Sequence, residues 1–231
     1  MDHQEPITGS SLRTPRAAAA AGILFSLLLG LAIILINVSA PSNPATAGDW
    51  LTDPARRAAI AVALNLVPFA GIAFLWFIGV VRDRIGQRED RFFASVFLGS
   101  GLLFVAMLFA AAAFAGGLIA DVTAGSASTP GPDTLALGRQ VTSLLLHVYG
   151  MRMAAVFTVS TATITLRTKV VPRWIGMLGF VIAVVLLVSV GLTVWVELLF
   201  PAWILLLSIE FLRTRLRQAP AAARTALSAE A

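Results

Sequence analysis

Three polar residues inside apolar stretches are the strongest candidates for chemistry in this sequence: Arg152, Glu197 and Asn65. Arg152 lies 15 residues before Arg167, which places it roughly 22 Å along a helix from that basic residue. Glu197 lies 15 residues before Leu212 and so reaches a similar depth. An arginine at the centre of a bilayer costs about 2.5–3.5 kcal/mol on insertion scales and therefore needs a partner. The spacing predicts an Arg152–Glu197 ion pair between two helices.

Two prolines are expected to free backbone carbonyls at this depth. Pro201 clashes with the carbonyl of Glu197, four residues earlier, and Pro68 does the same to Leu64, next to Asn65. We expect helix kinks at both prolines and one intramembrane polar layer in the outer half of the membrane. Its side chains are those of Asn65, Arg152 and Glu197. Such a layer could be a structural clamp, a site for a substrate or lipid head group, or a proton-coupled site.

His147 lies about one turn before Arg152, near the expected outer boundary of the membrane. An imidazole there could titrate near neutral pH. Metal-ligand residue types are missing around it, so we expect a polar residue at an interface. The hydroxyl side chains between Thr158 and Thr168 are expected to bond back to their own helix rather than line a pore.

The sequence lacks the residue sets of common membrane enzymes. It contains no cysteine, which excludes disulfides and thiolate metal sites. Gly99-Ser100-Gly101 invites comparison with an intramembrane serine protease, but Leu98 stands where that pattern needs glycine. There is also no H-E-x-x-H pattern, no phosphate-binding glycine loop and no aspartate pair in a span. We therefore predict no catalytic residues, no metal, no cofactor and a non-enzymatic protein.

Composition indicates an integral membrane protein that positions these residues on helices. Of 231 residues, 58% are hydrophobic and only 13% are charged, whereas soluble domains carry about 25% charged residues. So little charge cannot cover a water-facing surface, so much of the surface must face the lipid bilayer. The net charge of +5 does not indicate nucleic acid here, because the arginines flank apolar runs and are typical of anchors for anionic lipid head groups.

The apolar runs predict an all-α, polytopic bundle of six transmembrane helices in one domain. Each run is long enough, or nearly so, for a ~30 Å hydrocarbon core. A 16-residue N-terminal tail precedes them, and a basic, disordered tail is expected over 213–231. The predicted spans are about 17–38, 58–81, 92–120, 141–166, 174–190 and 192–212. The last two depend on a turn near Gly191, since the 39 residues from Trp174 to Leu212 are too many for one span.

The distribution of basic residues supports six spans with both termini in the cytoplasm. In that arrangement 13 basic residues lie inside and 3 outside, against 9 and 7 if 174–212 is a single span. Because cytoplasmic loops carry the excess of Lys and Arg, the six-span arrangement is favoured. We therefore expect a multi-pass protein of the bacterial inner, or plasma, membrane.

Small residues recur every four positions on the first span, at Gly22, Ser26 and Gly30. This spacing places them on one helix face, where a neighbouring backbone can approach closely. They are expected to serve packing within the bundle, or alternatively an interface with a partner subunit or a second copy.

The segments RDRIGQREDRFFASVFLGSGLLFVAMLF (82–109) and YGMRMAAVFTVSTATITLRTKVVPRWIGMLGF (149–180) resemble an uncharacterised family of small polytopic membrane proteins of actinobacteria. The resemblance extends from the second span to about Leu212. It marks Tyr149 and Arg152 as distinctive positions, and we expect Tyr149 and His147 at an interface. Such proteins in mycobacteria can be accessory subunits of envelope machines such as the Mce lipid importers, which is what the resemblance implies about function.

The sequence therefore favours an accessory or scaffold subunit of a larger inner-membrane complex, with other membrane subunits or a second copy as partners. The alternative is a small transporter or lipid-binding membrane protein that uses the polar layer around Arg152.

Overall fold

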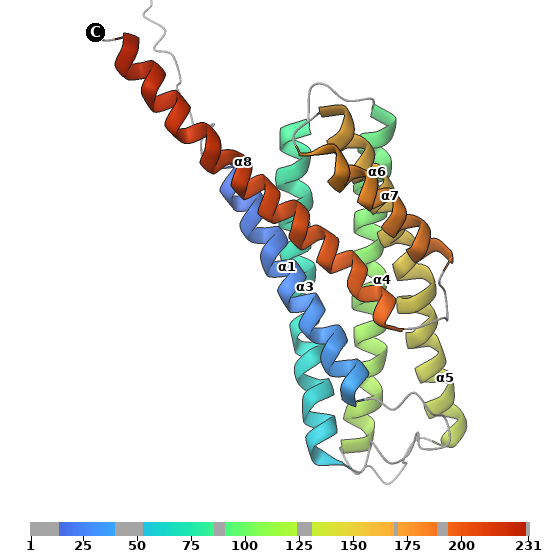
Figure 1. Ribbon diagram of the computed structural model, residues 1–231. Helices are drawn as coiled ribbons and strands as arrows, with labels where there is room; N and C mark the ends of the chain where they lie inside the picture. Colours follow the sequence, from blue (N-terminus) through green and yellow to red (C-terminus); the bar gives the residue numbers. More distant parts are fainter. Residues whose placement is uncertain are drawn as a thin grey trace, which may run out of the picture.

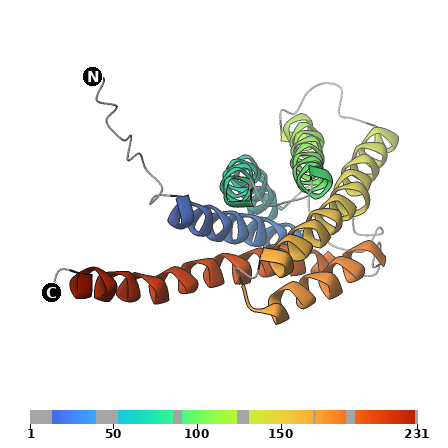
Figure 2. The same cartoon turned by 90° about the horizontal axis from the view of Figure 1, so that it is seen from above.

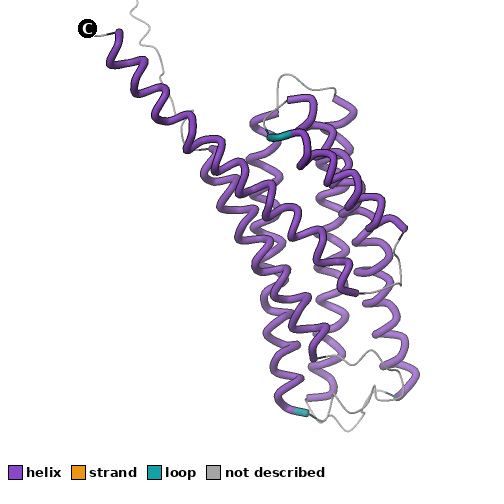
Figure 3. The backbone as a smooth tube through the Cα atoms, viewed as in Figure 1, coloured by secondary structure: helices purple, strands orange, loops and turns teal. Residues whose placement is uncertain are grey.

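The computed structural model describes residues 14–39, 53–85, 91–123, 131–168, 171–188 and 194–229. These residues are helical apart from short connecting positions, and no strand occurs among them (Figure 3). The α-helices are α1 (Thr14–Ser39), α3 (Pro54–Ile85), α4 (Arg91–Thr123), α5 (Pro132–Ser143), α6 (Met151–Thr168), α7 (Arg173–Val188) and α8 (Leu199–Ala229). A π-helix, η2 (Leu144–Gly150), joins α5 to α6, and a 3₁₀-helix, η3 (Val194–Leu198), precedes α8.

Five helical stretches in the described part of the chain are long and apolar enough to cross a membrane. They are Ala17–Ser39, Pro54–Arg82, Phe92–Ala120, Asp133–Thr168 and Trp195–Thr214. The sixth predicted span corresponds to α7, an apolar helix of 16 residues. At 1.5 Å per residue α7 is about 24 Å long, so it is the short member of the set.

The prediction that 174–212 contains two helices is confirmed, because α7 and η3–α8 are separate elements. The predicted turn near Gly191 lies outside the described residues. The backbone of α8 is helical to Ala229, and the disordered tail over 213–231 stays a prediction.

The helices form two groups of three (Figures 1 and 2). In one group α1 packs against both α3 and α8, and in the other α6 packs against both α4 and α7. Contacts of α3 with α4 and of α7 with α8 join the groups, while α5 packs on α4. The ends of α3 and α6 and the starts of α4 and α7 lie at one end of the bundle, which we call the arginine-rich end (Figure 1).

Phenylalanine rings close the centre of the bundle where the two groups meet. Phe74 lies 4.4 Å from Phe25 and 4.9 Å from Phe157, measured between ring centroids. Phe104 and Phe200 are 5.0 Å apart and edge-to-face. We call these five residues the aromatic cluster; each is fully buried, and they come from α1, α3, α4, α6 and α8. Because five helices contribute, the cluster is the common core of the fold.

The small residues of α1 have different surroundings. A Cβ added at Gly22 would overlap the Oγ of Ser208 on α8 and lie 2.8 Å from the Phe77 ring on α3. Ser26 is buried and its hydroxyl donates to the Gly22 carbonyl. At Gly30 an added Cβ would meet no atom within 4 Å. Close helix approach therefore concentrates at Gly22, where α1, α3 and α8 converge.

Gly22→Ala should lower the free energy of unfolding in mixed micelles by about 1–3 kcal/mol, because overpacking forces buried neighbours to move. Gly30→Ala is the matched control on the same helix, and it should leave stability unchanged or slightly raised, since alanine is the better helix former. Equal destabilisation by the two substitutions would contradict this assignment.

Candidate functional site

The His147 imidazole and the Glu197 carboxylate form a direct pair, with Nδ1 of His147 against Oε1 of Glu197. The histidine side chain is 32% exposed, whereas that of Glu197 is only 8% exposed. Both residues belong to stretches apolar enough to cross a membrane. An ionisable pair in such a position is a functional-site candidate by default.

His147 is positioned by the π-helix η2, which interrupts the long rod from α5 to α6. A π-helix closes i→i+5 hydrogen bonds, holds more residues per turn than an α-helix, and is often found at functional sites. The segment ends at the buried Gly150, where a Cβ would lie 3.1 Å from the Leu145 carbonyl and 3.7 Å from Met107 on α4. The absence of a side chain at Gly150 therefore suits the contact between the end of η2 and α4.

Glu197 is positioned by the 3₁₀-helix η3, the first element after the described part of α7. Pro201 follows as the third residue of α8, a position in the first turn where the missing N–H of proline is tolerated. The carbonyl of Glu197 therefore lies at the junction of two helix types, and Pro201 marks that junction. Pro68, by contrast, lies inside α3.

The predicted ion pair between Arg152 and Glu197 is replaced in the structure by the His147–Glu197 pair. Arg152, five residues after His147, is exposed. Within the described residues no acidic side chain lies within 4.0 Å of its guanidinium. The depth count gave only the level of each residue along α6 and α8. It did not give the direction in which a side chain points, and near this level the partly buried His147 faces Glu197 whereas Arg152 is exposed.

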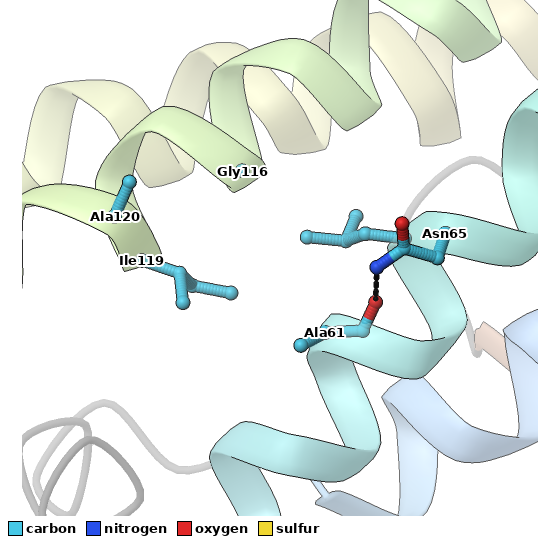
Figure 4. Close-up of a pocket in the computed structure, with 6 residues that line it drawn as sticks. Ala61, Asn65, Gly116, Ile119 and Ala120 are labelled. Carbon is cyan, nitrogen blue, oxygen red and sulfur yellow. Dashed lines mark hydrogen bonds between the residues drawn. The ribbon is translucent and has the colours of Figure 1, made fainter. Parts of the chain in front are cut away.

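Asn65 is exposed, and its side-chain amide donates to the carbonyl of Ala61 at 2.8 Å on its own helix. It lines a groove of about 320 Å³ between α3 and α4 (Figure 4). The other lining residues are Ala61, Leu64, Gly116, Ile119 and Ala120. No described hydrogen bond joins Asn65 to Arg152 or Glu197. The three members of the predicted polar layer thus have separate surroundings.

The hydroxyl side chains of α6 bond to their own helix, as expected. Thr158, Thr161 and Thr163 donate to carbonyls four residues earlier at 2.8–2.9 Å. Ser160 and Thr168 do the same, and Thr165 reaches the carbonyl three residues earlier. These groups are therefore satisfied locally.

Trp203 is a structural contact that the sequence did not single out. Its indole N–H donates to the Ile175 carbonyl at 3.1 Å, and its ring would lie 2.7 Å from a Cβ added at Gly179. Trp203 is fully buried. It fastens α8 to α7 and so supports the hairpin that carries Glu197. A tryptophan surrounded by apolar residues in the sequence shows no pattern that predicts its hydrogen-bond acceptor.

The His147–Glu197 pair can hold a proton between a ring nitrogen and a carboxylate oxygen, and it neutralises an acid that would be costly to bury alone. Within the part of the chain that the structure describes, no group of three or more histidine or acidic residues could hold a metal ion. The chemistry that the imidazole and the carboxylate themselves support is proton binding.

No protein-family model matches this chain, and no curated protein or solved structure is significantly similar to it. Function is therefore inferred from the geometry of the described residues.

A double-mutant cycle should show that His147 and Glu197 are energetically coupled. We expect a coupling free energy of about 1–2 kcal/mol between His147→Ala and Glu197→Gln, near the upper end for polar pairs in membrane proteins. The measurement is unfolding of the purified chain in mixed micelles.

The matched cycle pairs Glu197→Gln with Arg152→Gln, and its coupling should be close to zero because Arg152 is exposed and its side chain does not bond Glu197. A larger coupling free energy with Glu197 for Arg152 than for His147 would contradict the His147–Glu197 pair and support the Arg152–Glu197 ion pair predicted from the sequence.

Proposed function

We propose that this protein is a non-enzymatic, multi-pass protein of the bacterial plasma membrane that acts as an accessory or scaffold subunit of a larger membrane complex. The observation that carries the proposal is the aromatic cluster. Phe74 lies 4.9 Å from Phe157 and 5.8 Å from Phe200, measured between ring centroids, and all three rings are fully buried. Secondary transporters bind their substrates near the bilayer midplane between repeats, whereas here side chains from five helices fill the centre.

A bundle with a filled centre suits the binding of partner proteins on its outer surface better than the passage of a substrate through its interior. Its apolar outer sides suit the bilayer and the transmembrane helices of neighbouring subunits, and α7 contributes to these outer sides. Exposed apolar side chains on α7 include Met177, Val181, Val184 and Val188. The candidate partners are subunits of an envelope lipid-transport complex such as a mycobacterial Mce system, or a second copy of this chain.

The proposed topology has six spans with both termini in the cytoplasm. Its support is the arginine-rich end, where α3 carries Arg82, α6 ends after Arg167 and α7 begins at Arg173. The opposite end has fewer basic residues, among them Arg56, Arg57 and Arg139. This asymmetry matches the excess of basic residues in cytoplasmic loops.

Affinity purification of the tagged full-length chain from its native host in mild detergent, followed by mass spectrometry, tests the subunit role. Stoichiometric recovery of the same membrane partners is expected, and an unrelated polytopic protein with the same tag controls for general stickiness. Repeated recovery of the chain alone, at the mass of a monomer, would overturn the proposal.

The absence of native cysteines allows the topology to be tested with single-cysteine variants. In intact spheroplasts a membrane-impermeant maleimide should label Gln140→Cys on α5 and should label Thr168→Cys only after permeabilisation. Both positions are exposed, and Thr168 is the last residue of α6 at the arginine-rich end, whereas Gln140 lies in α5, before η2 and α6 on the same rod. The reverse labelling pattern would place the arginine-rich end outside the cell.

A further inference from the structure

Arg152 emerges from the bundle at the level where α7 ends. A Cβ added at Gly179 on α7 would lie 3.0 Å from the Ala162 side chain on α6. Because the two helices run in opposite directions, nine residues further along α7 brings Val188, its last residue, level with Met153. Arg152 is the next residue of α6, and it is exposed.

No described acid forms an ion pair with Arg152. Glu197 is engaged by His147, and Asp133 lies 19 residues earlier on the same rod. A Cβ added at Gly150 would lie 3.7 Å from Met107, which fixes the level of α4 beside α6. By this alignment Asp121 lies roughly 24 Å along α4 from the level of Arg152. In this part of the chain the guanidinium is therefore a cation that needs an anion from outside the described residues.

Aromatic side chains mark the boundary of the membrane near this cation. Tyr149, three residues before Arg152, is 55% exposed, and Trp195 of η3 is 50% exposed. Tyrosine and tryptophan are enriched where hydrocarbon meets the lipid head groups. Arginine side chains close to such a boundary extend along apolar surface until the charged group reaches the interface. Lipid phosphates are anions that lie at such a boundary.

We propose that Arg152 binds the phosphate of an anionic phospholipid in the leaflet opposite the arginine-rich end, with the Tyr149 hydroxyl as a second donor. A guanidinium presents two parallel N–H groups to phosphate oxygens, a stronger arrangement than a single neutral hydrogen bond. The exposed side chains Val184 and Val188 of α7 offer apolar surface to the acyl chains. The site does not depend on the subunit role, because its ligand is the bilayer itself.

Native mass spectrometry of the full-length chain, titrated in detergent with phosphatidylglycerol, tests the site. Arg152→Gln should weaken binding of one lipid about tenfold, and Tyr149→Phe about threefold, since one hydrogen bond to phosphate is lost. The affinity of Arg152→Lys should lie between those of the wild type and Arg152→Gln, because lysine keeps the positive charge but lacks the two parallel N–H groups of the guanidinium. The matched control is Arg139→Gln, an exposed arginine on α5, which should bind as the wild type does.

Two competitors distinguish the source of the phosphate. A neutral glucosyl diacylglycerol with the same acyl chains should bind at least about tenfold more weakly than phosphatidylglycerol, and an excess of inorganic phosphate should not displace the phospholipid. Equal affinity of the wild type and Arg152→Gln, or equal losses in Arg152→Gln and Arg139→Gln, would overturn the proposal. Displacement by inorganic phosphate would also overturn it in favour of a free-phosphate site. Should Arg152→Gln fail to fold, the comparison of Arg152→Lys with the wild type decides.

Discussion

The constraint on which this structure depends is that a polar group within hydrocarbon must find its partner inside the protein. Helices meet this requirement for the backbone, and the described elements are helical. The same requirement explains the side chains: hydroxyls such as Thr158 bond to their own turn, Asn65 turns back to Ala61, and the Trp203 indole reaches Ile175. The buried carboxylate of Glu197 pairs with the titratable imidazole of His147. Ser208 remains the one buried side-chain oxygen in the described residues for which no partner is found.

Once polar groups are satisfied locally, shape decides how the helices pack. In lipid, association depends on van der Waals packing and close backbone approach rather than on a hydrophobic driving force. The aromatic cluster supplies large interlocking surfaces at the centre, while Gly22 lets α1 approach α8 near Ser208. The two residues of the polar pair lie in helical segments that are not α-helical, His147 in the π-helix η2 and Glu197 in the 3₁₀-helix η3. Each segment directly precedes a packed α-helix, η2 before α6 and η3 before α8.

The sequence was informative about the all-helical fold, the apolar helices long enough to cross a membrane and the division of 174–212, because length and hydropathy determine these directly. It was wrong about the partner of Glu197. Depth counted at 1.5 Å per residue gives the level of a residue along its helix but not the direction in which its side chain points. The π-helix η2, which carries His147, has no composition signal, since LLLHVYG is an ordinary apolar segment with a terminal glycine. Which side chains of two helices meet depends on the rotation of each helix about its axis and on the angle at which the helices cross. A short stretch of a single sequence does not determine either quantity.

The shortness of α7 has a consequence for the surrounding bilayer. Its 16 residues span about 24 Å, whereas a typical hydrocarbon core is about 30 Å thick. Neighbouring helices such as α4, with 33 residues, exceed that thickness, so the protein presents unequal hydrophobic heights around its circumference. In the proposed six-span arrangement, lipids beside α7 compress while those beside α4 need not, at a cost of fractions of a kcal/mol per ångström. That arrangement would deform the membrane asymmetrically, and the elastic asymmetry would favour thinner bilayers and neighbours whose own helices share the mismatch.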